Sequence, residues 1–237
     1  MIVRKKLPYY VLAVIVIEFM CMLTNCMIMD DGIYSFLKTV LLYTKEQMTE
    51  QNVTAAGVMG RVDSYWMYII MAVDVCIPTL SYMFDEMNSN IYLGVQMRKG
   101  RYQYILSKCI FSMISGAVIV LISLSVFLII LMFMLPVNCD SDMLIANSVI
   151  TTGTGELINV FLHKTVKFSL YAGAVSLFGI FTVLVYADLL FDLSLVFILA
   201  YFSADAFMYD ILWAPIAVAA VLMILCSVIW GYRSRRL

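Results

Sequence analysis

The sequence predicts an all-α integral membrane protein with a single transmembrane domain, residues 1–237, six transmembrane helices and both chain ends in the cytoplasm. Three observations lead to this fold class. Apolar residues make up 64% of the chain and charged residues 13%, and the mean hydropathy is +0.97, whereas a soluble domain is about half apolar and a quarter charged. The apolar residues gather in segments long enough to cross a bilayer. Basic residues cluster between alternate segments.

Six segments meet the requirement of about 20 mostly apolar residues for a membrane helix. They cover residues 9–29, 65–84, 105–135, 166–187, 189–204 and 211–231. The first segment differs from a signal peptide because its apolar run is about 20 residues rather than 7–15 and no A-x-A-like site precedes Asp30, so we expect a retained span. The alternative for the fourth and fifth segments is one helix over residues 166–204, which is far too long for the ~30 Å hydrocarbon core.

Positive charge is distributed unevenly between the two ends of these spans. One side collects ten Lys and Arg residues in tight clusters, and the other side collects five. Because cytoplasmic loops carry the excess of Lys and Arg, the clusters place both chain ends and residues 84–108 in the cytoplasm. The ten are Arg4, Lys5, Lys6, Arg98, Lys99, Arg101, Lys108, Arg233, Arg235 and Arg236, and the five are Lys38, Lys45, Arg61, Lys164 and Lys167. The net charge of −1 does not indicate a nucleic-acid partner.

Two outer segments connect the predicted spans. In residues 31–52, apolar side chains recur at helical spacing opposite charged ones, which predicts an amphipathic helix that lies on the outer leaflet or caps a lumen. The alternative is a surface helix with no role in substrate handling. Residues 138–163 contain Gly153-Thr-Gly155 and are predicted to form a flexible loop, whose last part, residues 156–162, could extend the fourth span outward. Within the second span, Pro78 should kink the helix unless neighbours satisfy the freed carbonyl.

Most catalytic signatures are missing from the sequence. It contains no GxxxxGK[ST] motif, so we do not expect this chain to hold nucleotide phosphates in a P-loop. The single histidine, His163, excludes both HExxH and a metal site built on several histidines. The six cysteines fall mostly in apolar segments and form no CxxC, so they are interpreted as small apolar packing residues. We therefore expect neither a resident cofactor nor an enzyme.

Two carboxyl side chains, Glu18 and Asp74, lie near the centres of the first and second predicted spans. A lone charge at that depth costs roughly 2.5–3.5 kcal/mol on insertion scales. No Lys or Arg is predicted at the same depth. Either the carboxyls stay protonated and hydrogen-bonded within the protein, or they face a wet cavity on a transport path and attract a cationic group.

The segment between the second and third spans, residues 85–104, carries the most specific pattern. It begins with the acidic pair Asp85 and Glu86, and Asn88 or Ser89 can cap a short helix after it. Apolar contacts on that helix would come from Ile91, Val95 and Met97. Basic residues follow at Arg98, Lys99, Arg101 and Lys108. From the residues alone, an ordinary positively charged juxtamembrane loop remains the alternative.

This arrangement resembles the permease subunits of the type-2 ABC exporter family, which have six spans and an acidic residue after the second. In that family a short amphipathic coupling helix and a basic motif follow, and a lysine opens the third span. In this sequence Glu86 (or Asp85) corresponds to the acidic position and Lys108 to the lysine. Residues 88–97 correspond to the coupling helix, and Arg98 and Arg101 to the basic motif. The chain departs from the family in lacking Gly-Thr after the acidic residue.

The resemblance implies a multi-pass permease in the plasma membrane of a bacterium, paired with itself or with a sister permease. ATP and Mg²⁺ would be bound by separate cytoplasmic ABC ATPase subunits that dock on Asp85, Glu86, Ile91, Val95, Arg98, Arg101 and Lys108. Alternating access would then export a peptide, a drug or a lipid-like molecule past Glu18 and Asp74. The alternative functions are a non-transporting scaffold or sensor subunit and, third, an intramembrane enzyme.

Overall fold

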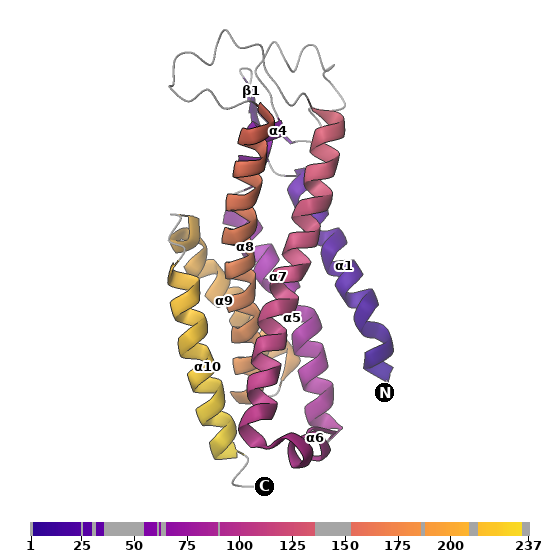
Figure 1. The fold of residues 1–237 in the computed structure, drawn as a ribbon, viewed down its shortest axis with the longest axis vertical. Helices are drawn as coiled ribbons and strands as arrows, with labels where there is room; N and C mark the ends of the chain where they lie inside the picture. Colours follow the sequence, from indigo (N-terminus) through magenta and orange to yellow (C-terminus); the bar gives the residue numbers. More distant parts are fainter. Residues whose placement is uncertain are drawn as a thin grey trace.

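The fold is a bundle of long helices, seen in a computed structural model (Figure 1). The structure describes residues 2–24, 26–29, 32–35, 55–60, 62, 65–89, 91–135, 153–185, 188–208 and 213–233. Within these ranges the helices are α1 (Ile2–Thr24), α4 (Ala55–Gly60), α5 (Tyr65–Asn88), α6 (Ile91–Lys99), α7 (Arg101–Met134), α8 (Gly153–Val185), α9 (Leu189–Met208) and α10 (Trp213–Arg233). A short antiparallel hairpin joins β1 (Cys26–Met29) to β2 (Gly32–Ser35).

The long helices identify the chain as a membrane protein. Four stretches in the described part of the chain are long and apolar enough to cross a bilayer: Met67–Asn88, Arg101–Met134, Leu157–Val185 and Ala214–Tyr232. Shorter apolar stretches lie in α1, over Val11–Met20, and in α9, over Leu190–Tyr201. The six-span count therefore stays a prediction.

The two ends of the bundle differ (Figure 1). At one end α6 connects the feet of α5 and α7, and the start of α1 and the end of α10 lie toward this same end. The hairpin and α4 lie at the opposite end. With 34 and 33 residues, α7 and α8 are each about 50 Å long at 1.5 Å per residue, so they extend well beyond a ~30 Å hydrocarbon core.

The outer connections differ from the sequence predictions. The first span was expected to reach residue 29, but α1 ends at Thr24 and residues 26–29 form β1. The amphipathic helix was expected from residue 31, but Gly32–Ser35 pairs with β1, with Met29 opposite Gly32. The rest of that predicted helix, residues 36–52, lies outside the described residues. Over so short a stretch, apolar residues can fit the spacing of a strand as well as that of a helix. The apolar spacing alone therefore did not distinguish a β-hairpin from an amphipathic helix.

The fourth and fifth predicted segments are separate helices, as expected. The carboxylate of Asp188 accepts the backbone N–H of Leu190 at 3.0 Å and that of Phe191 at 3.3 Å, which caps the start of α9. The predicted helical extension over residues 156–162 is present, because α8 already begins at Gly153; that it points outward stays a prediction. Gly153–Gly155 is therefore helical where the sequence suggested a flexible loop.

Small residues allow α7 and α8 to approach closely at the centre of the bundle. A Cβ atom on Gly116 would lie 2.5 Å from Ser176 Oγ and 2.9 Å from the carbonyl oxygen of Ala172. Ser112 and Gly116 on α7, like Ala172 and Ser176 on α8, are four residues apart, the small-xxx-small spacing that brings membrane helices together. From α5, the Cys76 thiol donates to the carbonyl of Val175 at 3.2 Å. The core thus lies where α5, α7 and α8 meet.

Candidate functional site

The short helix α6 is separated from its neighbours by two local features. The hydroxyl of Ser89 donates to the carbonyl of Asp85 at 2.7 Å, so it closes the end of α5 instead of capping α6 as the sequence suggested. Gly100, at φ 83°, ends α6 and precedes α7. A positive φ is strained for residues with a Cβ atom, which explains glycine at this break. The chain therefore turns twice within about a dozen residues, and α6 is held against the end of the bundle where α5 ends and α7 begins.

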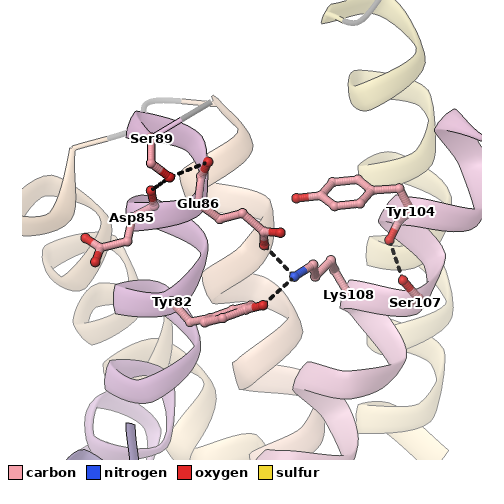
Figure 2. Close-up of polar contacts among 7 residues, drawn as sticks. All are labelled: Tyr82, Asp85, Glu86, Ser89, Tyr104, Ser107 and Lys108. Atoms are coloured by element: carbon pink, nitrogen blue, oxygen red, sulfur yellow. Dashed lines mark hydrogen bonds and ion pairs between the residues drawn. The ribbon is translucent and has the colours of Figure 1, made fainter. Parts of the chain in front are cut away.

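An ion pair joins the feet of α5 and α7 beside α6. The ammonium of Lys108 donates to the Glu86 carboxylate and to the Tyr82 hydroxyl, the latter at 3.1 Å (Figure 2). The Lys108 nitrogen also lies 4.2 Å from the centroid of the Tyr82 ring, in a cation–π contact. The two charged side chains are only 13% and 7% exposed. The sequence named Glu86 and Lys108 separately, and the structure brings them together.

The other acidic residue of the pair behaves differently. Figure 2 shows the Asp85 carboxylate directed away from Lys108, and the residue is exposed. Only Glu86 therefore contacts the third-span lysine. Tyr104 lies on the opposite side of the site, and Figure 2 shows its hydroxyl pointing toward Glu86.

Aromatic rings connect this site to α10. Trp230, which is only 1% exposed, lies 5.7 Å from the Tyr92 ring on α6 and 5.3 Å from the Tyr104 ring on α7, measured between ring centroids. Such aromatic pairs add about 0.5–1.5 kcal/mol beyond the area they bury. We call Tyr82, Glu86, Tyr92, Tyr104, Lys108 and Trp230 together the foot cluster. It ties α5, α6, α7 and α10 into one unit.

The opposite face of α6 points away from the bundle. Its exposed apolar side chains are Leu93, 37% exposed, and Met97, 87% exposed, and the neighbouring Arg98 and Arg101 are exposed as well. Val95, which the sequence placed among the docking residues, is partly buried against the core. The position of Leu93 on this face was missed, although Leu93 and Met97 are four residues apart on one helix face. Ile91 begins α6, and its side chain lies outside the described part.

Glu18 and Asp74 are buried within the bundle. Glu18 on α1 is 0% exposed, and neither of its carboxyl oxygens has a hydrogen-bond partner among the described residues. Asp74 on α5 is 7% exposed, and its Oδ2 atom is likewise unpartnered. The two carboxyls lie near enough to interact electrostatically, with Ser123 of α7 beside Glu18. The structure thus brings together two residues that the sequence placed only at similar depth.

Two further buried charged side chains were missed or misplaced. Asp192 on α9 is 0% exposed, and the sequence did not single it out as a buried charge within the fifth predicted span. Lys167 was counted among the outer basic residues, but it lies within the apolar stretch Leu157–Val185, is 4% exposed and sits 5.7 Å from the centroid of the Tyr68 ring. The predicted fourth span began at residue 166 and so put Lys167 at its start. Because α8 begins at Gly153, Lys167 lies near the middle of the helix.

The described residues contain no group of three or more His, Cys, Asp or Glu side chains that could hold a metal ion. Comparisons with protein-family models, with curated proteins and with solved structures found no match for this chain. Three features of the described residues bear on function: the foot cluster, the outward face of α6 and the buried carboxyls Glu18 and Asp74.

Proposed function

We propose that this chain is the membrane-spanning permease subunit of an ATP-driven transporter, with the organisation of a type-2 ABC exporter. In this proposal α6 is the coupling helix, and separate cytoplasmic ATPase subunits bind its outward face. Six helices, α1, α5, α7, α8, α9 and α10, would cross the plasma membrane of a bacterium, with both chain ends in the cytoplasm. The cargo would be a peptide, a drug or a lipid-like molecule, and a second permease chain would complete the transporter.

The foot cluster is the observation that carries this proposal. A helix that only closes a loop needs no buried ion pair to fix it. Here the Glu86–Lys108 pair joins the two helices on either side of α6, and Tyr92 packs α6 itself against Trp230. A force applied to α6 would therefore move α5, α7 and α10 together instead of deforming a loop. Interiors packed in this way transmit displacement because they resist compression.

The outward face of α6 supports docking of a protein partner. Met97 is 87% exposed at an end of the bundle where three basic residues, Arg98, Lys99 and Arg101, are also exposed. An exposed methionine suits an interface that must repack as the partner changes conformation. Basic residues around an apolar contact would favour a partner with a complementary acidic rim.

The orientation of the helices also supports the proposal. The start of α1 and the end of α10 lie toward the α6 end of the bundle (Figure 1). That end carries the basic residues Arg98, Lys99, Arg101 and Lys108. The excess of Lys and Arg at one end favours its placement in the cytoplasm, where ATP is available.

Co-purification followed by an ATPase assay tests the proposal. We expect the tagged chain, extracted from its native membrane in mild detergent, to bring down a P-loop ATPase in a fixed ratio. A double variant, Leu93→Asp with Met97→Asp, should lose this partner and its stimulated ATP hydrolysis at unchanged membrane levels. The control is Gln103→Asp, which adds a negative charge at an exposed position in the first turn of α7. An ATPase that remains bound to the double variant would refute docking on α6. Purification with partners that lack ATPase activity would favour a scaffold or sensor subunit.

A further inference from the structure

The helices α1, α5 and α7 enclose a set of oxygen atoms that have no donor. Both carboxyl oxygens of Glu18 and the Oδ2 atom of Asp74 are buried and unpartnered among the described residues. The hydroxyl of Ser123 lies within hydrogen-bonding reach of Glu18, but in this structure it donates to the carbonyl of Ile119 at 3.0 Å. Buried acceptors without donors destabilise a protein, and they do so more strongly when they are charged.

The backbone adds a further acceptor at the same place. Pro78 lies four residues after Asp74 within α5 and has no N–H to donate to the Asp74 carbonyl. The nearby Thr79 hydroxyl donates to the carbonyl of Cys76 at 2.9 Å and leaves the Asp74 carbonyl as it is. Asp74 therefore has an unpartnered side-chain oxygen and a backbone carbonyl whose usual donor in the helix is absent.

Among the residues that the structure describes, no Lys or Arg forms an ion pair with either carboxyl. From the helices packed on α1, Glu18 faces Asp74 of α5 and Ser123 of α7. On the other helices packed against α5, Lys167 of α8 lies by the Tyr68 ring and Asp192 of α9 lies near Thr182 and Asp188. Two ionised carboxylates here would each be costly to hold within the membrane and would also repel each other.

We propose that Glu18 and Asp74 form one proton-binding site that holds a single shared proton at neutral pH. One proton turns an acceptor into a donor, leaves one negative charge instead of two, and allows the carboxyls to hydrogen-bond to each other or to Ser123. Adjacent carboxyls in other proteins share a proton for the same electrostatic reason, and the pair titrates as one unit. A carboxyl within a membrane helix commonly marks a proton or ion pathway.

The consequence for transport rests on the proposed function, but the proton site does not. If the chain is a permease, opening the bundle between α1 and α5 would admit water, and the shared proton would leave to that water as a cationic group of the cargo replaces it. Transport would then depend on pH through this pair. Without any transport activity, the pair would still bind its proton.

Infrared spectroscopy of the full-length chain in lipid nanodiscs tests the site directly, because the C=O stretch of a protonated carboxyl is distinct from that of a carboxylate. We compare the wild type with Glu18→Gln, Asp74→Asn and the double variant at neutral pH. The infrared spectrum of the wild type minus that of the double variant should contain the signal of one protonated carboxyl. This signal should fall about tenfold per pH unit above the midpoint of its titration. Each single variant should titrate at a shifted midpoint, because its remaining carboxyl has lost its partner.

Two matched controls accompany these spectra. Asp85→Asn changes an exposed carboxyl on the same helix and should leave the difference signal unchanged. Asp192→Asn removes a separate buried carboxyl, and its effect on the spectrum should be independent of the substitutions at Glu18 and Asp74. A difference signal equal to two protonated carboxyls, or to none, would overturn the shared proton. Amide replacements keep the side-chain size, and circular dichroism confirms that each variant is folded.

Discussion

Removing Lys108 is the perturbation whose consequence the structure specifies most closely. Lys108→Met keeps most of the side-chain volume but leaves the Glu86 carboxylate, only 7% exposed, without its cation. Breaking a buried pair in this way costs about 3–5 kcal/mol. Lys108 is 13% exposed, so some water reaches the pair and we expect the lower end, about 3 kcal/mol. That corresponds to about a 100-fold fall in the ratio of folded to unfolded protein.

The assay is unfolding in mixed micelles of increasing SDS fraction, followed by circular dichroism and tryptophan fluorescence. Glu86→Gln should cost about 2 kcal/mol, because the amide oxygen can still accept from Lys108 but the negative charge that compensates the ammonium is gone. The double variant should cost less than the sum of the two, with a coupling energy of about 1–2 kcal/mol. Lys99→Met, on the exposed face of α6, is the control and should stay within about 0.5 kcal/mol. Additive effects at Glu86 and Lys108 would refute the ion pair as the connection between α5 and α7.

Three further predictions concern the packing of α7 against α8, the contact between α7 and α10, and the capping of α9. Gly116→Ala should destabilise the bundle by about 1–3 kcal/mol, because its Cβ would lie 2.9 Å from the Ala172 carbonyl oxygen. Gly94→Ala, with no atom within 4 Å, is the control, and equal unfolding curves for the two would contradict the close α7–α8 contact. In a variant that retains only Cys109 and Cys226, copper phenanthroline should form an intramolecular disulfide between α7 and α10, since both thiols are buried where these two helices pack and lie near enough to affect each other electrostatically. If both thiols remain fully titratable after oxidation, that contact is wrong. Asp188→Ala should cost about 0.5–2 kcal/mol through the lost α9 cap, whereas Asp188→Asn should restore most of it, and equal losses would exclude capping.

The apolar composition and the lengths of the apolar segments predicted a helical membrane protein, because these two properties determine whether a segment can move from water into the bilayer. The short helix before the third span was also predicted, as residues 88–97, and the structure places it at Ile91–Lys99. The break between α8 and α9 was predicted at residue 188, and the structure gives its local cause, because Asp188 is an N-cap residue immediately before an apolar run. Helix ends followed from local chemistry in these cases.

What the sequence could not provide was the pairing of residues far apart in the chain. Glu86 and Lys108 are separated by 22 residues, and nothing in their spacing shows that two antiparallel helix ends bring them together. The same holds for Glu18 and Asp74, whose proximity depends on how α1 packs against α5. The β-hairpin was missed because its apolar residues match a helical spacing as well as a strand spacing over so short a stretch.

The most direct test of the coupling role of α6 is photocrosslinking from its outward face in native membranes. A photoreactive amino acid at Met97 should crosslink to a P-loop ATPase, with a yield that changes when ATP is added. The same group at Met132, which is 49% exposed on the apolar surface of α7, should crosslink to lipid. Crosslinks from position 97 to lipid alone, or to a protein without a nucleotide site, would contradict the assignment of α6 as the coupling helix.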